Sequence, residues 1–187
     1  SVKIRNVRIQ DLSAKVQGIP TQPVKENPAE RAAAAFLLGR TKLTIGIEVQ
    51  GEYRKVESAD DLPAEPFTVV VVDYHPKQNL TVDDLAKVAE FSSLRHLSIG
   101  YAEVTKEMLK HVGGMRALKS LHLMYCNIDD AKMDQLKGLT DLEHLLLGGT
   151  QVSDAGLQHL SEMQSLVRLG LFDSKVSGSN LTALEGL

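Results

Sequence analysis

The sequence contains one cysteine, no tryptophan and only 4% aromatic residues. A single cysteine excludes a disulfide within the chain, so side-chain packing and backbone hydrogen bonds must hold the fold together. The sequence also lacks any run of about 18 consecutive apolar residues, the length that a membrane-spanning helix requires. We therefore expect no membrane insertion of this segment.

An excess of charge of one sign and the common catalytic motifs are also missing. The chain has 21 basic and 24 acidic residues and a formal net charge of −3, which predicts no binding to nucleic acid or to an anionic membrane surface. It contains no G-x-S-x-G nucleophile elbow, no G-x-x-x-x-G-K-[ST] phosphate loop and no H-E-x-x-H zinc helix. We expect no enzyme, no catalytic residue and no cofactor.

A 24-residue period runs through the C-terminal half of the chain. Leucine recurs in one register at this spacing, at Leu94, Leu118, Leu142 and Leu166. Further apolar columns stand three and five positions after each of these leucines, and such alternation is typical of a β-strand. The closer apolar spacing that follows, as at Met108, Leu109 and Val112, is typical of a helix. Each unit predicts a short strand and a helical return, the pattern of a leucine-rich repeat.

Two columns of small or polar residues stand between the predicted strands and helices. Residues whose side-chain oxygen can cap a helix start form the column Thr81, Thr105, Asp129, Ser153 and Ser177. Small residues form the column Ala102, Cys126, Thr150 and Ser174. We interpret Cys126 as a buried structural residue, because unpaired cysteine is among the most buried residue types. The alternative, a nucleophilic cysteine, has no supporting motif.

The pattern divides the chain into three segments. Residues 1–28 are predicted to be an extended linker or tether, although residues 2–9 alternate like a strand that could pair with the hairpin or with another chain. Residues 29–66 are a predicted N-terminal cap, made of an alanine-rich helix that ends at Gly39 and a β-hairpin over 42–56. Residues 67–187 contain five predicted repeats, the first with a three-residue insertion within 73–79.

The C-terminal end of the predicted array has no cover. Leu187 stands in register with Met163, so the chain stops where a sixth repeat would begin. We interpret the chain as a fragment of a longer protein, or as one whose edge a partner covers. An open edge predicts that the last apolar residues are less buried than their counterparts Leu123, Met133 and Leu136. The residues concerned are Leu171, Leu181 and Leu184.

The repeats resemble the bacterial leucine-rich repeats that carry T-D-x-G-L at the start of the helix. Residues 152–157, V-S-D-A-G-L, are the nearest copy, whereas Lys106-Glu107-Met108 departs from the motif. The segment over 32–67 resembles the cap that precedes such repeats in bacterial multidomain proteins, some of them attached to kinase domains. The resemblance implies an α/β leucine-rich repeat solenoid with a parallel concave β-sheet and helices on the convex side. It implies a recognition scaffold and transfers no catalytic residue.

The outward side chains of the predicted concave sheet are the candidate binding surface. Alternation points the leucines inward and the intervening residues, beginning with Val69 and Val71, outward. Because this outward set is mostly apolar or imidazole, we favour protein binding over cross-strand packing alone. Three tyrosines share a column at the strand ends, where they suit either an interface hot spot or a stacked ladder that stiffens the rim. The predicted partner-binding residues are Tyr74, His96, Tyr101, His122, Met124, Tyr125, His144, Arg168 and Phe172.

Three histidines raise the question of a metal site. His96 and His144 share a column, and His122 lies diagonal to both, so their imidazoles could converge. Zinc needs a tighter cage with supporting hydrogen bonds, and solvated or hydrogen-bonded histidines are far more common. We predict no metal.

Two function classes remain. The first is a protein-interaction module whose concave face or tyrosine rim docks a protein partner. The second is a structural spacer or assembly unit of a larger bacterial protein, which self-associates through its open C-terminal edge. An apolar face exposed in the single chain favours the first, and an edge covered by a second copy favours the second.

Overall fold

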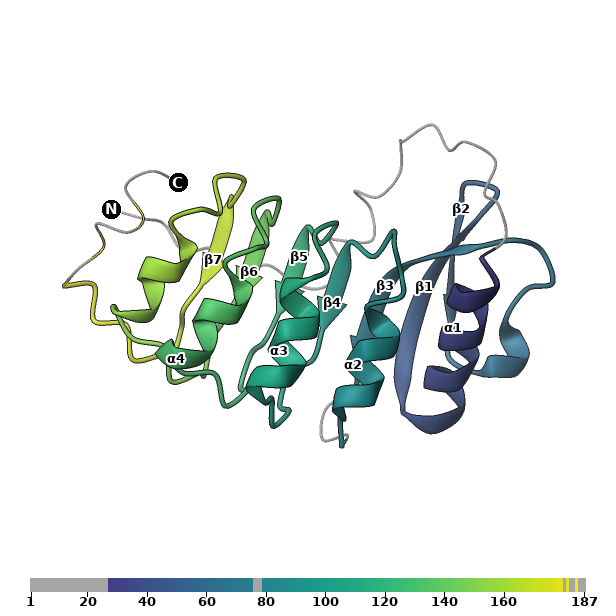
Figure 1. Ribbon diagram of the computed structural model, residues 1–187, viewed down its shortest axis with the longest axis horizontal. Coiled ribbons are helices and arrows are strands. Elements are labelled where there is room, and N and C mark those ends of the chain that lie inside the picture. The colour runs from purple at the N-terminus through teal and green to yellow at the C-terminus, as the bar shows by residue number, and fades with distance from the viewer. Residues whose placement is uncertain (1–26, 76–78, 180, 182–183, 185–187) are drawn as a thin grey trace.

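The computed structural model describes residues 27–75, 79–179, 181 and 184 (Figure 1). Most of the predicted linker over 1–28 lies outside the described residues, as does the candidate strand over 2–9. The two linker residues that are described belong to a helix start, since Asn27 Oδ1 accepts hydrogen bonds from the N–H groups of Ala29 and Glu30. The helix begins at Pro28, one residue before the predicted cap boundary.

The N-terminal part contains one helix and a β-hairpin. Helix α1 is followed by strands β1 and β2, with the bounds Pro28–Arg40, Leu43–Val49 and Glu52–Val56. Gln50 and Gly51 make the predicted tight turn, and both have positive φ, 51° and 87°, as a two-residue hairpin loop of this kind requires. A short 3-10 turn, η2 (Ala59–Asp61), then leads to strand β3 (Thr68–Tyr74).

The remaining elements alternate short strands with helical returns. The strands are β4 (His96–Ser98), β5 (Ser120–His122), β6 (His144–Leu146) and β7 (Arg168–Gly170). The returns are α2 (Val82–Val88), α3 (Lys106–Gly113), α4 (Asp130–Met133) continued by η3 (Asp134–Leu136), and the 3-10 helix η4 (Gly156–Leu160). The helical character therefore weakens from α3 to η4. None of the described helices is long and apolar enough to cross a membrane.

All seven described strands form one sheet in the order β2-β1-β3-β4-β5-β6-β7. The sequence predicted a parallel sheet, and this is right only from β3 to β7. Strand β1 pairs antiparallel with both β2 and β3, because the hairpin extends the sheet directly and Leu43 pairs with Tyr74. The fold is therefore mixed α/β, with a sheet that is partly antiparallel.

The helices lie on one face of the sheet (Figure 1). Helix α1 contacts β1 and β3, and α2 contacts its neighbours α1 and α3. The core between the two layers is made of leucines in register on adjacent strands: Leu97, Leu121 and Leu145 are all fully buried. The other face of the sheet, which none of the described helices covers, is called the open face below.

The residues between strands and helices cap three of the predicted helix starts. The side-chain oxygens of Thr81, Thr105 and Asp129 accept backbone N–H groups of α2, α3 and α4 respectively. Ser153 Oγ accepts the N–H of Ala155 at 3.3 Å, and the N–H and hydroxyl of Ser153 also donate to the two carboxylate oxygens of Asp130, at 2.7 and 2.6 Å. This part of the column links one unit to the next.

The last described apolar residues are less buried than their counterparts in the middle of the array, as the sequence predicted. The three counterparts in the middle of the array are fully buried: Leu123, Met133 and Leu136. Leu171 and Leu184 are half-buried, and Leu181 is 39% exposed. The predicted difference in burial is confirmed, and Leu187 lies outside the described residues.

Candidate functional site

The open face presents two rows of side chains. In each parallel strand, residues in alternate positions point to the same face, and the register places them side by side across the sheet. One row is Val71, His96, Ser120, His144 and Arg168, and the other is Asp73, Ser98, His122, Leu146 and Gly170.

Two residues that the sequence placed on this surface lie in the core. The pairing of β1 with β3 skips Val70, so Ile47 pairs with Val69, and Val69 is fully buried. Tyr74 is the last residue of β3 and is also buried in the core. The expectation of exposure was wrong for both. Val69 lies next to the irregular pairing at Val70, and β3 continues through Tyr74, whereas β5 ends three residues before Tyr125.

A polar cluster occupies the middle of the open face. His96 Nε2 lies 3.0 Å from Asp73 Oδ1, and the rings of His96 and His122 meet edge to face with their centroids 4.6 Å apart. His122 Nε2 in turn lies 3.2 Å from the hydroxyl oxygen of Ser120. These four residues are called the imidazole cluster.

Burial decides the chemistry of His122. The residue is only 4% exposed, and this burial lowers the pKa of His122 to about 3, with the neighbouring His96 as the next cause. A neutral imidazole with so low a pKa is a weak base, and the adjacent Ser120 is itself buried. The pair therefore lacks the accessible nucleophile and strong base that acyl transfer needs.

No group of three or more histidine, cysteine, aspartate or glutamate side chains within the described ranges has the geometry to hold a metal ion. The structure brings His96 and His122 together, yet each points a ring nitrogen at a protein oxygen. The sequence places these imidazoles where they could converge on one point and predicts no metal; the rings of His96 and His122 pack edge to face.

Three exposed aromatic side chains lie beyond the carboxyl ends of the strands. Tyr101, Tyr125 and Phe172 are 53%, 42% and 42% exposed. The rings of Tyr101 and Tyr125 stack at 4.7 Å with an angle of 16°, and Phe172 meets Tyr125 edge to face at 5.9 Å. These three residues, called the aromatic ledge, form one continuous cluster although they come from three different repeats.

The backbone under the aromatic ledge is left-handed in four successive units. Tyr101, Tyr125, Gly149 and Asp173 have φ values of 62°, 58°, 69° and 53°. Glycine and aspartate accept this conformation readily, whereas a tyrosine pays a steric cost of about 1 kcal/mol or more. Two tyrosines therefore occupy strained positions while keeping much of their side chains in water.

Two glycines of one repeat make room for the aromatic ledge. A Cβ at Gly148 would collide with the ring of Phe172, and a Cβ at Gly149 would collide with the ring of Tyr125. Both rings therefore lean over the turn that follows β6. The sequence-based prediction included neither glycine among the binding residues. The signal that it missed was the pairing of glycines in one repeat with large aromatic residues at the same two positions of the flanking repeats.

Apolar side chains continue the aromatic ledge onto the open face. Met124 is half-buried beside Tyr125, and half-buried Leu146 leans over Gly170, whose added Cβ would lie 2.8 Å from Leu146 Cδ2. Of the predicted binding residues, the structure thus gathers Tyr101, Met124, Tyr125 and Phe172 at the strand ends. It places His96, His122, His144 and Arg168 lower on the same face.

Cys126 lies beneath the aromatic ledge and is buried. Its Sγ is 2.9 Å from the carbonyl oxygen of Ile99, and burial raises the pKa of the thiol. A buried thiol with a raised pKa is a poor nucleophile. The predicted burial of Cys126 is confirmed.

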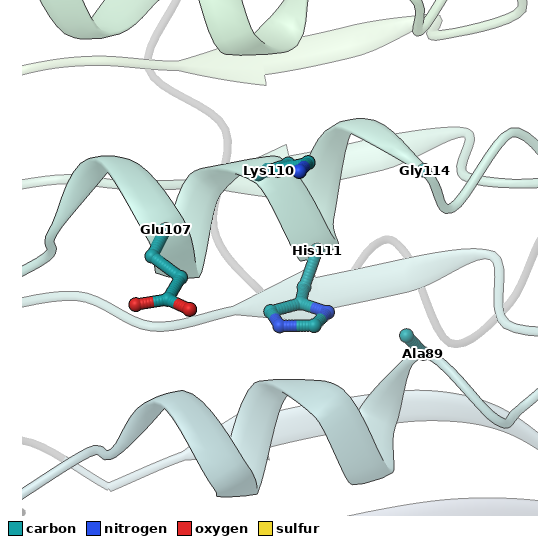
Figure 2. Close-up of a pocket in the computed structure, with 5 residues that line it drawn as sticks. All are labelled: Ala89, Glu107, Lys110, His111 and Gly114. Atoms are coloured by element: carbon teal, nitrogen blue, oxygen red, sulfur yellow. The ribbon is translucent and has the colours of Figure 1, made fainter.

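A shallow hollow of about 360 Å³ lies on the helical side of the molecule, between α2 and α3 (Figure 2). Figure 2 shows Glu107 and His111 projecting from α3 toward α2, with Ala89 and Gly114 near the ends of these helices. The hollow is partly open to solvent, and three of the residues that line it are polar or charged, Glu107, Lys110 and His111, so it is not an enclosed apolar site for a small molecule.

Comparisons with known proteins relate the chain to solved structures only. No protein-family model matches the sequence, and no curated protein does. An internalin from Listeria monocytogenes superposes with a TM-score of 0.51 and 23% identity, over 61% of this chain and 31% of the internalin. An internalin C2 from the same species superposes with a TM-score of 0.47 and 16% identity, over 86% of this chain and 80% of that protein.

The likeness to the first internalin concerns the fold. Internalins are leucine-rich repeat proteins, so this chain shares its arrangement of short strands and returns with a leucine-rich repeat structure. The chain spans about a third of the length of that internalin.

Proposed function

We propose that this chain is a protein-interaction module, a leucine-rich repeat solenoid whose open face is concave and docks a protein partner. The fold shared with an internalin and the 24-residue strand spacing support the solenoid. The N-terminal helix and hairpin fit the role of its cap, since they cover the first repeat strand with β1 and α1.

The aromatic ledge is the observation that carries the proposal. A chain selected for stability alone would place glycine, asparagine or aspartate at left-handed positions, as it does at Gly149 and Asp173. Strained backbone that persists at exposed residues is a feature of functional sites. Tyrosine is also enriched in binding hot spots, because it offers a large rigid area and a hydroxyl group.

The other predicted binding residues lie beside the aromatic ledge or lower on the open face. Met124 extends the apolar surface beside the aromatic ledge. His96, His144 and Arg168 supply hydrogen-bonding or charged groups lower on the open face, whereas His122 is only 4% exposed and contacts His96 rather than a partner. Tyr74 is left out, because it lies in the core.

The test compares partners captured by variants of the two faces. The protein is immobilised as wild type, as Tyr101→Ala/Tyr125→Ala, and as Phe36→Ala, and captured proteins are identified by mass spectrometry. Phe36 is a matched control, because it is an aromatic residue of α1 that is 40% exposed. The proposal expects a protein that wild type and Phe36→Ala capture and the double variant does not.

The captured protein is then purified and its dissociation constant measured against each variant. Alanine at either tyrosine should weaken binding by about 1–2 kcal/mol or more, the range of interface hot spots. Thermal unfolding of the same variants controls for loss of the fold. If wild type, the double tyrosine variant and Phe36→Ala bind the partner with equal affinity and have equal stability, the proposal that the open face docks this partner is wrong.

The assembly unit remains the second candidate, and it rests on a different observation. At the C-terminal end of the sheet, Val167 is 80% exposed and Leu181 is 39% exposed. Exposed apolar residues beside a strand with an unpaired edge favour association with another chain. The mass in solution, measured over a hundredfold range of concentration, tests this candidate: a monomer throughout excludes self-association.

A further inference from the structure

Arg168 is an open-face residue whose charged guanidinium group lacks a partner among the described residues. It is half-buried at the start of β7, and no hydrogen bond or ion pair of its guanidinium group is found with any described residue. Arginine is the side chain best suited to bind a carboxylate through two parallel hydrogen bonds. A half-buried guanidinium without such a partner indicates a position where an anionic group can bind.

The groups around Arg168 leave its positive charge uncompensated. Its register neighbour is His144, and the only carboxylate of the two open-face rows is Asp73, which is paired with His96. Asp73 is on β3, four strands away, which corresponds to about 19 Å. Of the nearby acidic residues outside the rows, Glu143 pairs with Lys119 at 3.5 Å. Asp173 lies five residues further along the chain, beyond the strand end.

An apolar path connects Arg168 with the aromatic ledge. Gly170 lies between Arg168 and Phe172 on the same face, and Leu146 fills the space above it. Phe172 then leans over Gly148 and meets Tyr125. The four side chains Arg168, Leu146, Phe172 and Tyr125 form a strip, called the anchor strip, with a cation at one end and aromatic rings at the other.

We infer that the anchor strip binds an extended acidic peptide segment of the partner, in which an aspartate or glutamate stands about four residues from a large apolar side chain. The four-residue step from Arg168 to Phe172 corresponds to about 13 Å, which an extended peptide of the same length matches. The carboxylate binds the Arg168 guanidinium, and the apolar side chain packs on Phe172 and Tyr125. This inference rests on the proposed function and adds the chemistry of the partner.

The charge of the molecule favours a peptide carboxylate over a nucleic-acid phosphate as the anion. The net charge is −3, and the anchor strip contains one arginine rather than the basic stripe that tracks a phosphate backbone. Aromatic residues together with arginine are the residue types enriched where protein interfaces bury their centre.

The first test is a selection of random twelve-residue peptides displayed on phage against the folded protein. Wild type should enrich peptides that combine aspartate or glutamate with phenylalanine, tryptophan or leucine. Arg168→Gln should retain the apolar preference and lose the acidic one, and Arg168→Glu should select lysine or arginine instead. Lys175→Gln removes an exposed basic residue near β7 that is not on the anchor strip, so it should select the same peptides as wild type.

The second test measures the interaction between the guanidinium group of Arg168 and the carboxylate of the bound peptide. The strongest selected peptide is synthesised together with its neutral analogue, Asp→Asn or Glu→Gln. The analogue should bind wild type and Lys175→Gln about tenfold or more weakly, in line with the loss of one partner of a desolvated charge pair. On Arg168→Gln, the two peptides should bind within about twofold of each other.

The outcomes separate this inference from the proposed function. Selected peptides that depend on Tyr125 and Phe172 but show no acidic preference would overturn the inference and leave the docking surface in place. Peptides that bind equally well to Tyr125→Ala/Phe172→Ala and to wild type would contradict both. An acidic preference that survives Arg168→Gln at unchanged stability would also overturn the inference, because another cation would then bind the carboxylate.

Discussion

At the scale of single residues, several side chains lie in positions that cost conformational or solvation free energy. The two tyrosines of the aromatic ledge have a left-handed backbone conformation, and the imidazole of His122 is buried. Gly148 and Gly149 are the counterparts of these residues, because the space they leave is what the aromatic rings fill. Each of these costs is measurable by substitution.

Gly149→Ala should destabilise the protein by about 1–3 kcal/mol, because it places a Cβ at positive φ and also displaces the ring of Tyr125. Gly178→Ala is the matched control, since Gly178 has a φ of 77° and open space around its Cα. It should show only the backbone cost. Chemical denaturation of both variants checks this prediction, and equal losses would mean that the ring moves freely and does not occupy a fixed position.

His122 should make the free energy of unfolding dependent on pH. Its pKa is about 3 in the folded protein against a reference value of 6.5, so between these values the unfolded chain binds one proton more than the folded chain. The contribution of His122 to stability is complete above about pH 6.5 and is lost as the pH falls toward 3, by at most about 1.4 kcal/mol per pH unit.

The variant His122→Gln tests that dependence, because glutamine stays neutral and can still reach the hydroxyl of Ser120. Denaturation curves at pH 7 and pH 4 should show a smaller loss of stability for His122→Gln than for wild type. A loss of the same size in both proteins would mean that other groups account for the acid sensitivity.

At the scale of elements, hydrogen bonds between neighbouring units matter as much as the helices themselves. Asp130 accepts both the N–H and the hydroxyl of Ser153, and Asp154 accepts the N–H and hydroxyl of Ser177 in the same way. Hydrogen bonds from the hydroxyls of Ser177 and Ser179 lower the pKa of Asp154 to about 2. Such links hold the C-terminal units in register even though their returns are short.

Asp130→Ala should destabilise the protein by about 1–3 kcal/mol, because it leaves the partly buried N–H and hydroxyl of Ser153 without acceptors. The equivalent change Asp154→Ala should cost less, since the groups around Ser177 are exposed and water can replace the carboxylate. Unfolding by urea compares the two variants. A larger loss from Asp154→Ala would contradict the importance of burial at this link.

The repeat period predicted the strands and the core well, because a two-residue alternation fixes which side chains point inward. It did not predict which outward side chains would be covered by their neighbours, and so it did not foresee that His122 would be buried. It also misplaced Tyr74, because β3 pairs with the antiparallel β1 and continues straight where the later strands turn. Both differences come from contacts between elements, which no single repeat encodes.

At the scale of the whole molecule, the two faces of the sheet differ in kind. The helical side is packed against the sheet, with an open hollow between α2 and α3. The open face combines the imidazole cluster, the aromatic ledge and the anchor strip on one surface. This asymmetry is what a recognition scaffold needs, because one layer maintains the fold while the other is available to a partner.

The affinity of the purified partner for Tyr101→Ala/Tyr125→Ala, measured beside Phe36→Ala and together with thermal unfolding, tests the central claim most directly. The account predicts a loss of about tenfold or more for the double tyrosine variant, unchanged affinity for Phe36→Ala, and unfolding free energies within about 1 kcal/mol of wild type for both. Alanine keeps a Cβ at positive φ and so leaves the backbone strain unchanged, and the lost stacking of these two exposed rings should cost only about 1 kcal/mol. Unchanged affinity with a large loss of stability would contradict the claim and assign the tyrosines to the stiffness of the rim.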